Sequence, residues 1–219
     1  MEMLKLYGYW RSSAAYRVRI ALHLKQIPFE QESVNLAPAI RAHQSNEFKA
    51  INPQMRVPAL KTPDGILTQS MAILEWIEET YPENPLLPDT AMERAKCRAL
   101  ADIIACDVHP LNNPSVLGAL KNDLGATESQ RATWYADWIH RGFAALEVFA
   151  KERAGDFLCG DVPSLAEICL IPQMYNARRF NVDLTGFPNL VSIDVACLNL
   201  APFQAAIPEN QPDAVPPNP

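Results

Sequence analysis

Residues 11–19 concentrate the hydroxyl and guanidinium groups that could do chemistry in this chain. They read Arg11-Ser12-Ser13-Ala14-Ala15-Tyr16-Arg17-Val18-Arg19, and they lie where a short apolar segment gives way to an amphipathic helical pattern. Hydroxyls at such a turn can accept hydrogen bonds from the free backbone N–H groups of the helix, or can face a ligand at the positive end of its dipole. Caps of this kind are common, so the segment gains meaning from the motifs that follow it.

Two dipeptides further along the chain complete this group. Val57-Pro58 precedes a predicted strand. A cis bond there would leave the N–H and C=O of Val57 free to pair with an extended peptide, and a plain edge proline is the alternative. Gln69-Ser70 opens a predicted helix, where Ser70 is either a simple N-cap or, with the Gln69 amide and the backbone N–H groups, an anchor for a carboxylate.

The elements that must position these residues alternate in the first part of the chain. Apolar runs bounded by turn residues predict strands at 4–7, 29–33, 59–61 and 66–67. Helical periodicity predicts helices at 13–25, 46–50 and 70–81. The predicted order is therefore β-α-β-α-β-β-α, and the closely spaced Pro82, Pro85 and Pro88 then mark a linker.

The rest of the chain has a helical pattern. Its apolar stripes are Leu100, Ile103, Ile104 and Val108, then Trp134, Trp138, Leu146 and Phe149. Ser164 and Glu167 have the spacing of a capping box, in which each side chain bonds the backbone N–H of the other residue. We expect an α/β domain at 1–82, an all-α domain at 90–212 and a Pro-rich tail at 213–219.

Composition limits the classes of function. The 219 residues are 48% apolar, so the chain can bury a sizeable core, and its net charge of -6 disfavours binding to nucleic acid or to an acidic membrane surface. No apolar run approaches membrane-spanning length, and the first residues lack the pattern of a secretory signal. The five cysteines have no metal-ligand spacing, so we expect no metal site and buried thiols in a reducing cytoplasm.

Together these motifs resemble the thioredoxin-like domain of soluble glutathione transferases, and from Leu4 to about Pro212 the chain resembles the zeta class of that family. Zeta enzymes carry the pattern S-S-C-x-[WH]-R-V-R-I-A-L, in whose place this chain has residues 12–22. Other similar stretches are Asn52-Pro53, Val57-Pro58, Gln69-Ser70, residues 110–113, Gly160-Asp161 and residues 179–184. The resemblance implies the glutathione transferase fold, glutathione as cofactor and a homodimer.

The resemblance also implies roles for individual residues. Ser12 would hydrogen-bond the glutathione sulfur and favour its thiolate, with Ser13 as a second donor or a cap. Val57 would pair with the cysteinyl backbone, Gln69 and Ser70 would hold the γ-glutamyl end, and His43 would lie near the glycine end. The full set of cofactor-binding residues implied is Ser12, Ser13, Arg17, His43, Val57, Pro58, Gln69, Ser70, Asn113 and Ser115.

Zeta relatives include maleylacetoacetate isomerase and maleylpyruvate isomerase, so the resemblance implies cis–trans isomerisation of a small dianionic keto acid. A dianion needs cations that fix its carboxylates, which arginine does bidentately. Arg179 matches the zeta arginine and is favoured over Arg178, and Arg11 is the second candidate. His109 is a third candidate because His-Pro resembles the maleylpyruvate enzymes, whereas Pro114-Ser115 resembles the maleylacetoacetate type.

Ala14 is a departure, because the zeta pattern has cysteine there. Its presence removes a nucleophile from the protein, so the glutathione thiol itself would have to do the covalent chemistry. Two other functions stay open: a zeta-class transferase that acts on small α-halo acids through the same site, and a non-catalytic glutathione-fold subunit. Retention of the motifs of the binding site disfavours the last of these: Ser12, Val57-Pro58, Gln69-Ser70 and Arg179.

Overall fold

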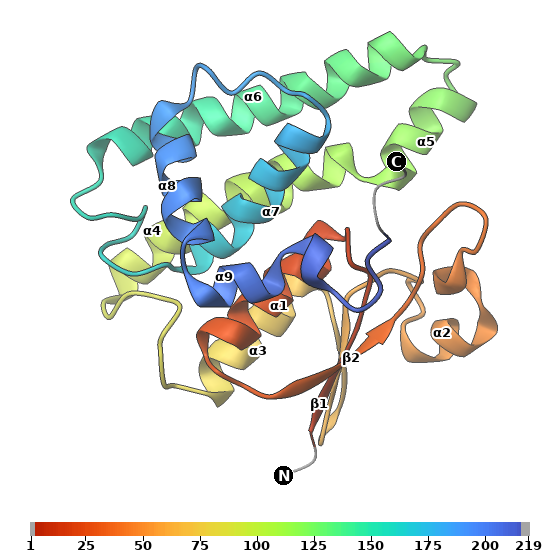
Figure 1. Ribbon diagram of the computed structural model, residues 1–219, viewed down its shortest axis with the longest axis horizontal. Helices are drawn as coiled ribbons and strands as arrows, with labels where there is room; N and C mark the ends of the chain where they lie inside the picture. The colour runs from red at the N-terminus through yellow and green to blue at the C-terminus, as the bar shows by residue number, and fades with distance from the viewer. Residues whose placement is uncertain (1–2, 216–219) are drawn as a thin grey trace. The chain divides into compact units, whose positions relative to one another are not determined.

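A computed structural model describes residues 3–215 of the protein (Figure 1). The described residues form two compact units: residues up to Pro85 together with those from Asn199 onward, and Leu86–Leu198. Residues 199–212 therefore pack with the first unit, although their position in the sequence groups them with the helical domain expected at 90–212. Residues 213–215 of the expected tail are described, and 216–219 lie outside the described residues.

The first unit is built on a four-stranded sheet whose order is β2-β1-β3-β4. Its strands are β1 (Leu4–Gly8), β2 (Phe29–Ser33), β3 (Ala59–Thr62) and β4 (Gly65–Thr68). β1 is parallel to β2, with Leu4 opposite Phe29, whereas β1–β3 and β3–β4 are antiparallel. The helices are α1 (Ser13–Leu24), α2 (Asn46–Ile51) and α3 (Ser70–Thr80), with a 3-10 turn η1 (Ala42–Gln44). The predicted order of elements is confirmed.

Figure 1 shows α1 and α3 on one side of this sheet and α2 on the other. Along β1 every second side chain is buried, which places Leu4 and Leu6 against Val18 of α1 and Ile73 of α3. The ends of the two helices are also joined, because the buried Lys25 ammonium lies 2.8 Å from the Glu78 carboxylate and donates to the carbonyls of Tyr81 and Glu83. Apolar packing and this buried ion pair fix how α1 and α3 lie relative to one another.

The later residues of the first unit lie against α1. They form α9 (Ala201–Ala206) and the 3-10 turn η4 (Pro208–Asn210). The fully buried Arg19 guanidinium donates to the carbonyl of Ala206 at 3.2 Å and to that of Trp10 at 2.9 Å. The Asp213 carboxylate accepts from the Trp10 N–H and from the Ser33 hydroxyl. These hydrogen bonds explain why residues beyond Asn199 belong with the first unit.

The second unit is helical, and α7 (Leu165–Arg179) is its most buried element. The other elements are α4 (Ala91–Asp102), a π-helix η2 (Ile103–Val108), a 3-10 turn η3 (His109–Asn112), α5 (Pro114–Asn122), α6 (Glu128–Glu152) and α8 (Pro188–Leu198). α7 contacts α4, η2, α6 and α8. The predicted capping box is confirmed: Ser164 accepts from the backbone of α7, and the Glu167 carboxylate accepts from the Ser164 N–H at 2.8 Å.

Two expectations for this unit are wrong in part. The buried face of α6 carries Tyr135, Ile139, Phe143 and Leu146. Phe149 is instead 49% exposed, because the buried stripe runs one residue away from the two tryptophans. The cysteines are also not all buried, since Cys106 is exposed on the π-helix and Cys159 is half-buried.

Candidate active site

The first turn of α1 holds the predicted serines. Ser12 is the N-cap: its Oγ accepts from the Ala15 N–H at 3.3 Å, and its own N–H donates to the Tyr9 carbonyl at 2.9 Å. The Ser12 side chain is half-buried, whereas Ser13 is buried. The cap uses a lone pair of the Ser12 oxygen and leaves its O–H proton available to a ligand at the positive end of the helix dipole.

Arg17 and Ser70 join the first turn of α1 to the first residue of α3. The Arg17 Nη1 donates to Ser70 Oγ at 3.3 Å, and both side chains are buried. Within residues 3–215, the Arg17 Nε and Nη2 atoms have no hydrogen-bond partner. A buried guanidinium with two unsatisfied donors is costly unless an anion pairs with it. The arrangement is therefore suited to a carboxylate ligand, the second of the two roles that the sequence left open for Ser70; the first, a simple N-cap, is wrong, because Gln69 is the N-cap of α3.

The residue before Ser70 has an unusual backbone. Gln69 lies at φ 68 and ψ 116, in a region that non-glycine residues rarely adopt and that costs on the order of 1–3 kcal/mol. Its exposed side chain donates from Nε2 to Gln54 Oε1 at 2.7 Å. Sequence reasoning did not find Gln54, since nothing in the sequence pairs residues 15 positions apart in two loops. The strained backbone at Gln69 directs this amide toward the loop that leads into β3.

That loop ends in the cis peptide bond Val57-Pro58, which is one of the two alternatives that the sequence left open. Asn52 is buried and organises the loop: its Nδ2 donates to the Arg56 carbonyl at 2.6 Å and its Oδ1 accepts from the Gln54 N–H at 3.0 Å. No backbone hydrogen bond within the described part of the chain uses the N–H or C=O of Val57. An extended peptide could therefore pair with the Val57 backbone, in the manner of an added strand.

Two further predicted residues lie in the first unit. His43 is half-buried in η1, and burial, with the nearby Arg41 charge, lowers the pKa of its imidazole. The neutral imidazole is thereby favoured, and its buried Nδ1 has no partner in the structure that is described. The Arg11 guanidinium lies 4.3 Å from the centre of the Trp10 ring, which limits the positions that this side chain adopts.

In the second unit the structure distinguishes two adjacent arginines. The Arg178 Nη1 lies 2.6 Å from the buried Asp194 carboxylate. Arg179 stacks instead on the Phe180 ring, 4.9 Å from its centre, and pairs with no carboxylate in the described part of the chain. Burial raises the pKa of the nearby Tyr135, which the Arg179 charge partly offsets. Arg179 is thus the arginine of the two that has no carboxylate partner in the described part of the chain, and the substrate-binding role that the resemblance implies for it stays a prediction.

Asn113 begins α5 and is occupied as its cap. The Asn113 Oδ1 accepts from the N–H groups of Ser115 and Val116, and its Nδ2 donates to the Pro110 carbonyl at 2.6 Å. Ser115 is exposed and also bonds the Asn113 Oδ1 through its hydroxyl. His109 is half-buried at the start of η3. For Asn113 the hydrogen bonds define a structural role, beside which the implied contact with a cofactor stays a prediction.

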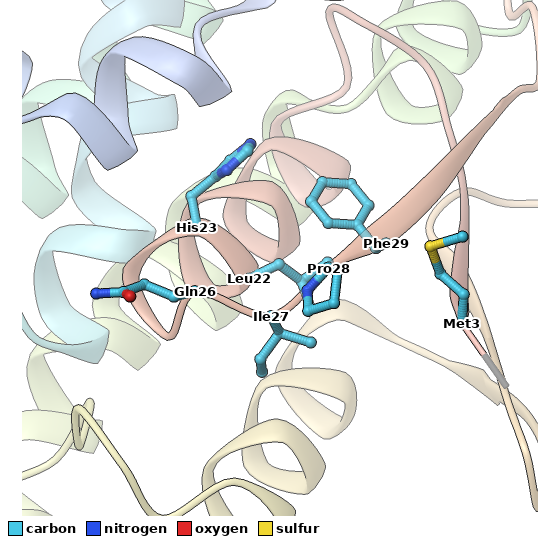
Figure 2. Close-up of a pocket in the computed structure, with 7 residues that line it drawn as sticks. All are labelled: Met3, Leu22, His23, Gln26, Ile27, Pro28 and Phe29. Carbon is cyan, nitrogen blue, oxygen red and sulfur yellow. The ribbon is translucent and has the colours of Figure 1, made fainter. Parts of the chain in front are cut away.

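Two cavities lie away from the predicted site residues. A cavity of about 470 Å³ opens at the carboxyl end of α1, lined by Met3, Leu22, His23, Gln26, Ile27, Pro28 and Phe29 (Figure 2). None of the predicted site residues lines it, because Ser12 lies at the opposite end of the helix, about 18 Å away at 1.5 Å per residue. A second cavity of similar volume in the helical unit lies beside the π-helix and Trp138.

Within residues 3–215 there is no cluster of ligating side chains suited to a metal ion, and no helix has both the length and the apolar character needed to cross a membrane.

The amino-acid sequence is similar to those of glutathione transferases and of two kinds of isomerase. Residues 2–79 match the family described as Glutathione S-transferase, N-terminal domain. The chain is 44% identical over 214 residues to a probable maleylacetoacetate isomerase of Vibrio cholerae, covering 98% of this chain and all of that one. It is 45% identical to a maleylpyruvate isomerase of Ralstonia sp, covering 96% of this chain and all of the relative.

Solved structures agree with these relatives. The holo structure of a maleylpyruvate isomerase, described as a bacterial zeta-class glutathione S-transferase, matches with a TM-score of 0.93 at 45% identity and covers 96% of this chain and all of that one. A maleylacetoacetate isomerase from Anaeromyxobacter dehalogenans with glutathione bound in its active site matches with a TM-score of 0.87 at 44% identity, covering 97% of this chain and 98% of that one.

Proposed function

The chain belongs to the zeta class of the glutathione transferase family, and on that premise we propose that it is a glutathione-dependent cis–trans isomerase. Its substrate is maleylacetoacetate or maleylpyruvate, which it converts to the fumaryl isomer. The observation that carries this proposal is the similarity, at 44–45% identity over nearly the whole chain, to relatives named as isomerases of these two keto acids.

The residues of the first unit suit glutathione. Its γ-glutamyl carboxylate would meet the two unpartnered donors of Arg17 and the Ser70 hydroxyl. The Val57 backbone would pair with the cysteinyl residue, the Gln69 amide would hold the γ-glutamyl end, and His43 would contact the glycine end. When bound, glutathione supplies a thiolate that adds reversibly to the activated double bond, so that the bond rotates before the thiolate leaves.

Ser12 would stabilise the thiolate form of the glutathione sulfur. Its oxygen already accepts the Ala15 N–H, so the cap does not use its O–H proton, which can be donated to a thiolate. A hydrogen bond from a hydroxyl and the positive end of the α1 dipole both favour the anion over the thiol, whose ordinary pKa is about 8.5. Ser13, which is buried, supports the turn or acts as a second donor. Since residue 14 is alanine, the protein offers no thiol of its own at this turn.

Cationic side chains would bind the carboxylates of the keto acid. Arg179 carries no carboxylate partner in the described structure, so its planar guanidinium can bind a substrate carboxylate bidentately. Arg11, stacked on Trp10, is the second such group, and His109 is a candidate hydrogen-bond donor to the keto acid.

We further infer that the protein acts as a homodimer in the cytoplasm, as the family resemblance implies. Light scattering of the purified protein tests the dimer.

The proposal is tested by giving the purified protein each keto acid with and without glutathione and following the loss of the cis chromophore. We expect isomerisation that requires glutathione and does not consume it, with one keto acid preferred. Dichloroacetate is the parallel substrate: release of halide without isomerase activity would replace the isomerase by the α-halo acid transferase. Glutathione binding with no turnover of any of the three substrates would instead favour a binding subunit.

A further inference from the structure

Phe180, the residue after Arg179, contacts two side chains of opposite character. The centre of its ring lies 4.9 Å from the Cζ atom of the Arg179 guanidinium and 4.2 Å from the centre of the Tyr135 ring. Tyr135 lies on the buried face of α6 and is 4% exposed, whereas Phe180 is 44% exposed and Arg179 is exposed. Phe180 therefore connects the buried core of the helical unit to a cation at its surface.

The backbone of Phe180 is fixed by the way in which α7 ends. The Asn181 N–H donates to the Arg178 carbonyl at 3.0 Å, and Asn181 has a left-handed backbone, at φ 53, which asparagine tolerates better than most residues. The Val182 N–H donates to the Ala177 carbonyl at 2.9 Å. These two hydrogen bonds are those of a Schellman motif, in which Phe180 is the C-cap of the helix. The position of the Phe180 ring is therefore set by the backbone as well as by its packing.

Arg179 differs from its neighbour Arg178 in what holds its side chain. The Arg178 guanidinium lies 2.6 Å from the buried Asp194 carboxylate, which fixes it against α8. Within residues 3–215 the Arg179 guanidinium has neither a hydrogen bond nor an ion pair, so its contact with the Phe180 ring is what limits its conformations. The ring attracts the cation without using any of its five N–H donors, and all of these donors stay available to a carboxylate.

The contact with Phe180 matters for binding because arginine has a long and flexible side chain. Such a side chain loses rotamer freedom when it binds a ligand, and this loss weakens binding. An arginine that is already held against a ring has less freedom to lose. Its planar guanidinium also binds a carboxylate bidentately only when the two groups are correctly oriented, so a fixed position favours the bidentate contact.

We propose that Phe180 is a positioning residue: its ring, supported by Tyr135, holds the Arg179 guanidinium where it binds a carboxylate of the keto acid. Phe180 acts through Arg179, so it needs no contact with the substrate, and this role rests on the isomerase function proposed above. The effect of Phe180 should therefore appear in the KM of the keto acid and disappear once the Arg179 side chain is removed.

Two substitutions separate the effect of the ring from that of an apolar side chain. Phe180→Leu removes the ring, whereas Phe180→Tyr keeps it, and we expect both variants to fold because Phe180 is 44% exposed. Steady-state kinetics give KM and kcat for the keto acid. Isothermal titration gives the Kd of malonate, an unreactive dicarboxylate, for the glutathione-loaded protein. Phe149→Leu, at a phenylalanine of α6 that is 49% exposed, is the matched control.

Phe180→Leu should raise the KM of the keto acid and the Kd of malonate about 3-fold, as expected for loss of a cation–π contact at an exposed site. It should leave kcat and the glutathione Kd unchanged, because the ring affects only how well Arg179 binds a carboxylate. Phe180→Tyr and Phe149→Leu should keep the wild-type values. In protein that carries Arg179→Ala, Phe180→Leu should have no further effect, because the group through which the ring acts is gone.

The proposal is overturned if Phe180→Leu leaves both constants unchanged, or if it raises them as much in the Arg179→Ala protein as in the wild type. A wild-type protein that binds malonate but isomerises neither keto acid would refute the proposed function alone, since the malonate Kd still decides the role of Phe180. A wild-type protein that neither binds malonate nor isomerises either keto acid would overturn both proposals.

Discussion

The two units contain helix caps that look alike in sequence and differ in what they leave available. Ser12 caps α1 with one lone pair and keeps its proton, and the buried Arg17 beside Ser70 keeps two donors without partners. Asn113 caps α5 and has both ends of its amide occupied. The arginines of α7 repeat the contrast, since Arg178 is paired and Arg179 is not. A polar residue can thus be assigned to a ligand by the hydrogen bonds that the fold leaves unmade.

The largest effect is expected for a substitution of Arg17, whose two donors have no partner in the described structure. Arg17→Met should weaken glutathione binding about 100-fold, because two charge-assisted hydrogen bonds are lost. The same variant should melt at an equal or higher temperature, since an apolar residue of similar size replaces a buried charge without a partner. Isothermal titration and thermal melting measure the two effects. Arg141→Met, at an exposed arginine of the other unit, is the control, and an unchanged glutathione affinity in Arg17→Met would remove Arg17 from the site.

Ser12→Ala is expected to lower kcat about 30-fold and to raise the glutathione Kd much less, since a hydrogen bond to a charged sulfur contributes roughly 1.5–3 kcal/mol. The pH at which kcat reaches half its maximum should move upward, because the thiolate loses a donor. Loss of the cap should also reduce stability by about 1 kcal/mol. Ser13→Ala is the matched variant. If it alone reduces turnover, the role of sulfur donor moves from Ser12 to Ser13.

Arg179→Ala should raise the KM of the keto acid about 10-fold and leave the glutathione Kd unchanged, because one bidentate carboxylate contact is lost. Its neighbour gives the matched control. Arg178→Ala leaves the buried Asp194 unpaired, so it should lower the Tm while sparing the KM. Equal KM values for wild type and Arg179→Ala would place the substrate carboxylate elsewhere, with Arg11 as the next candidate to substitute.

The smallest effect is expected for a substitution of Asn113, the cap of α5. Asn113→Ala should reduce the free energy of unfolding by about 1 kcal/mol and change the glutathione KM by less than about twofold. Urea unfolding and steady-state kinetics measure the two quantities, with Asn113→Asp as the variant that retains capping. A clear rise in the glutathione KM for Asn113→Ala, with Asn113→Asp unaffected in stability, would assign Asn113 to the cofactor after all.

Much of the first unit could be predicted because its signals are local. Alternating burial in β1, the spacing of Ile73 and Ile77 in α3, and serine at helix starts are all readable within a few residues. The family resemblance then supplied roles that no local pattern carries, such as that of Arg17. That Arg17 has unpartnered donors emerges only when α1 and α3 are placed side by side.

Features that depend on distant contacts or on irregular backbone were missed. The π-helix at Ile103–Val108 leaves no mark in the sequence; it contains Ile104 and Val108 of the predicted apolar stripe, and both are buried. The α6 stripe was placed one residue away because helical spacing alone does not show which apolar side chains face the core, and Trp134 is half-buried with its indole N–H bonded to the Leu111 carbonyl.

The buried Arg19 has a consequence for how the protein is made. Its guanidinium bonds the carbonyls of Trp10 and Ala206, so the first unit lacks the second of these contacts until residues beyond Asn199 have emerged from the ribosome. More than one hundred residues of the helical unit are translated in between, which takes about 5–20 s at 5–20 residues per second. During that interval the face of α1 that α9 later covers stays open to chaperones, while the helical unit, whose residues are contiguous, can complete its own core.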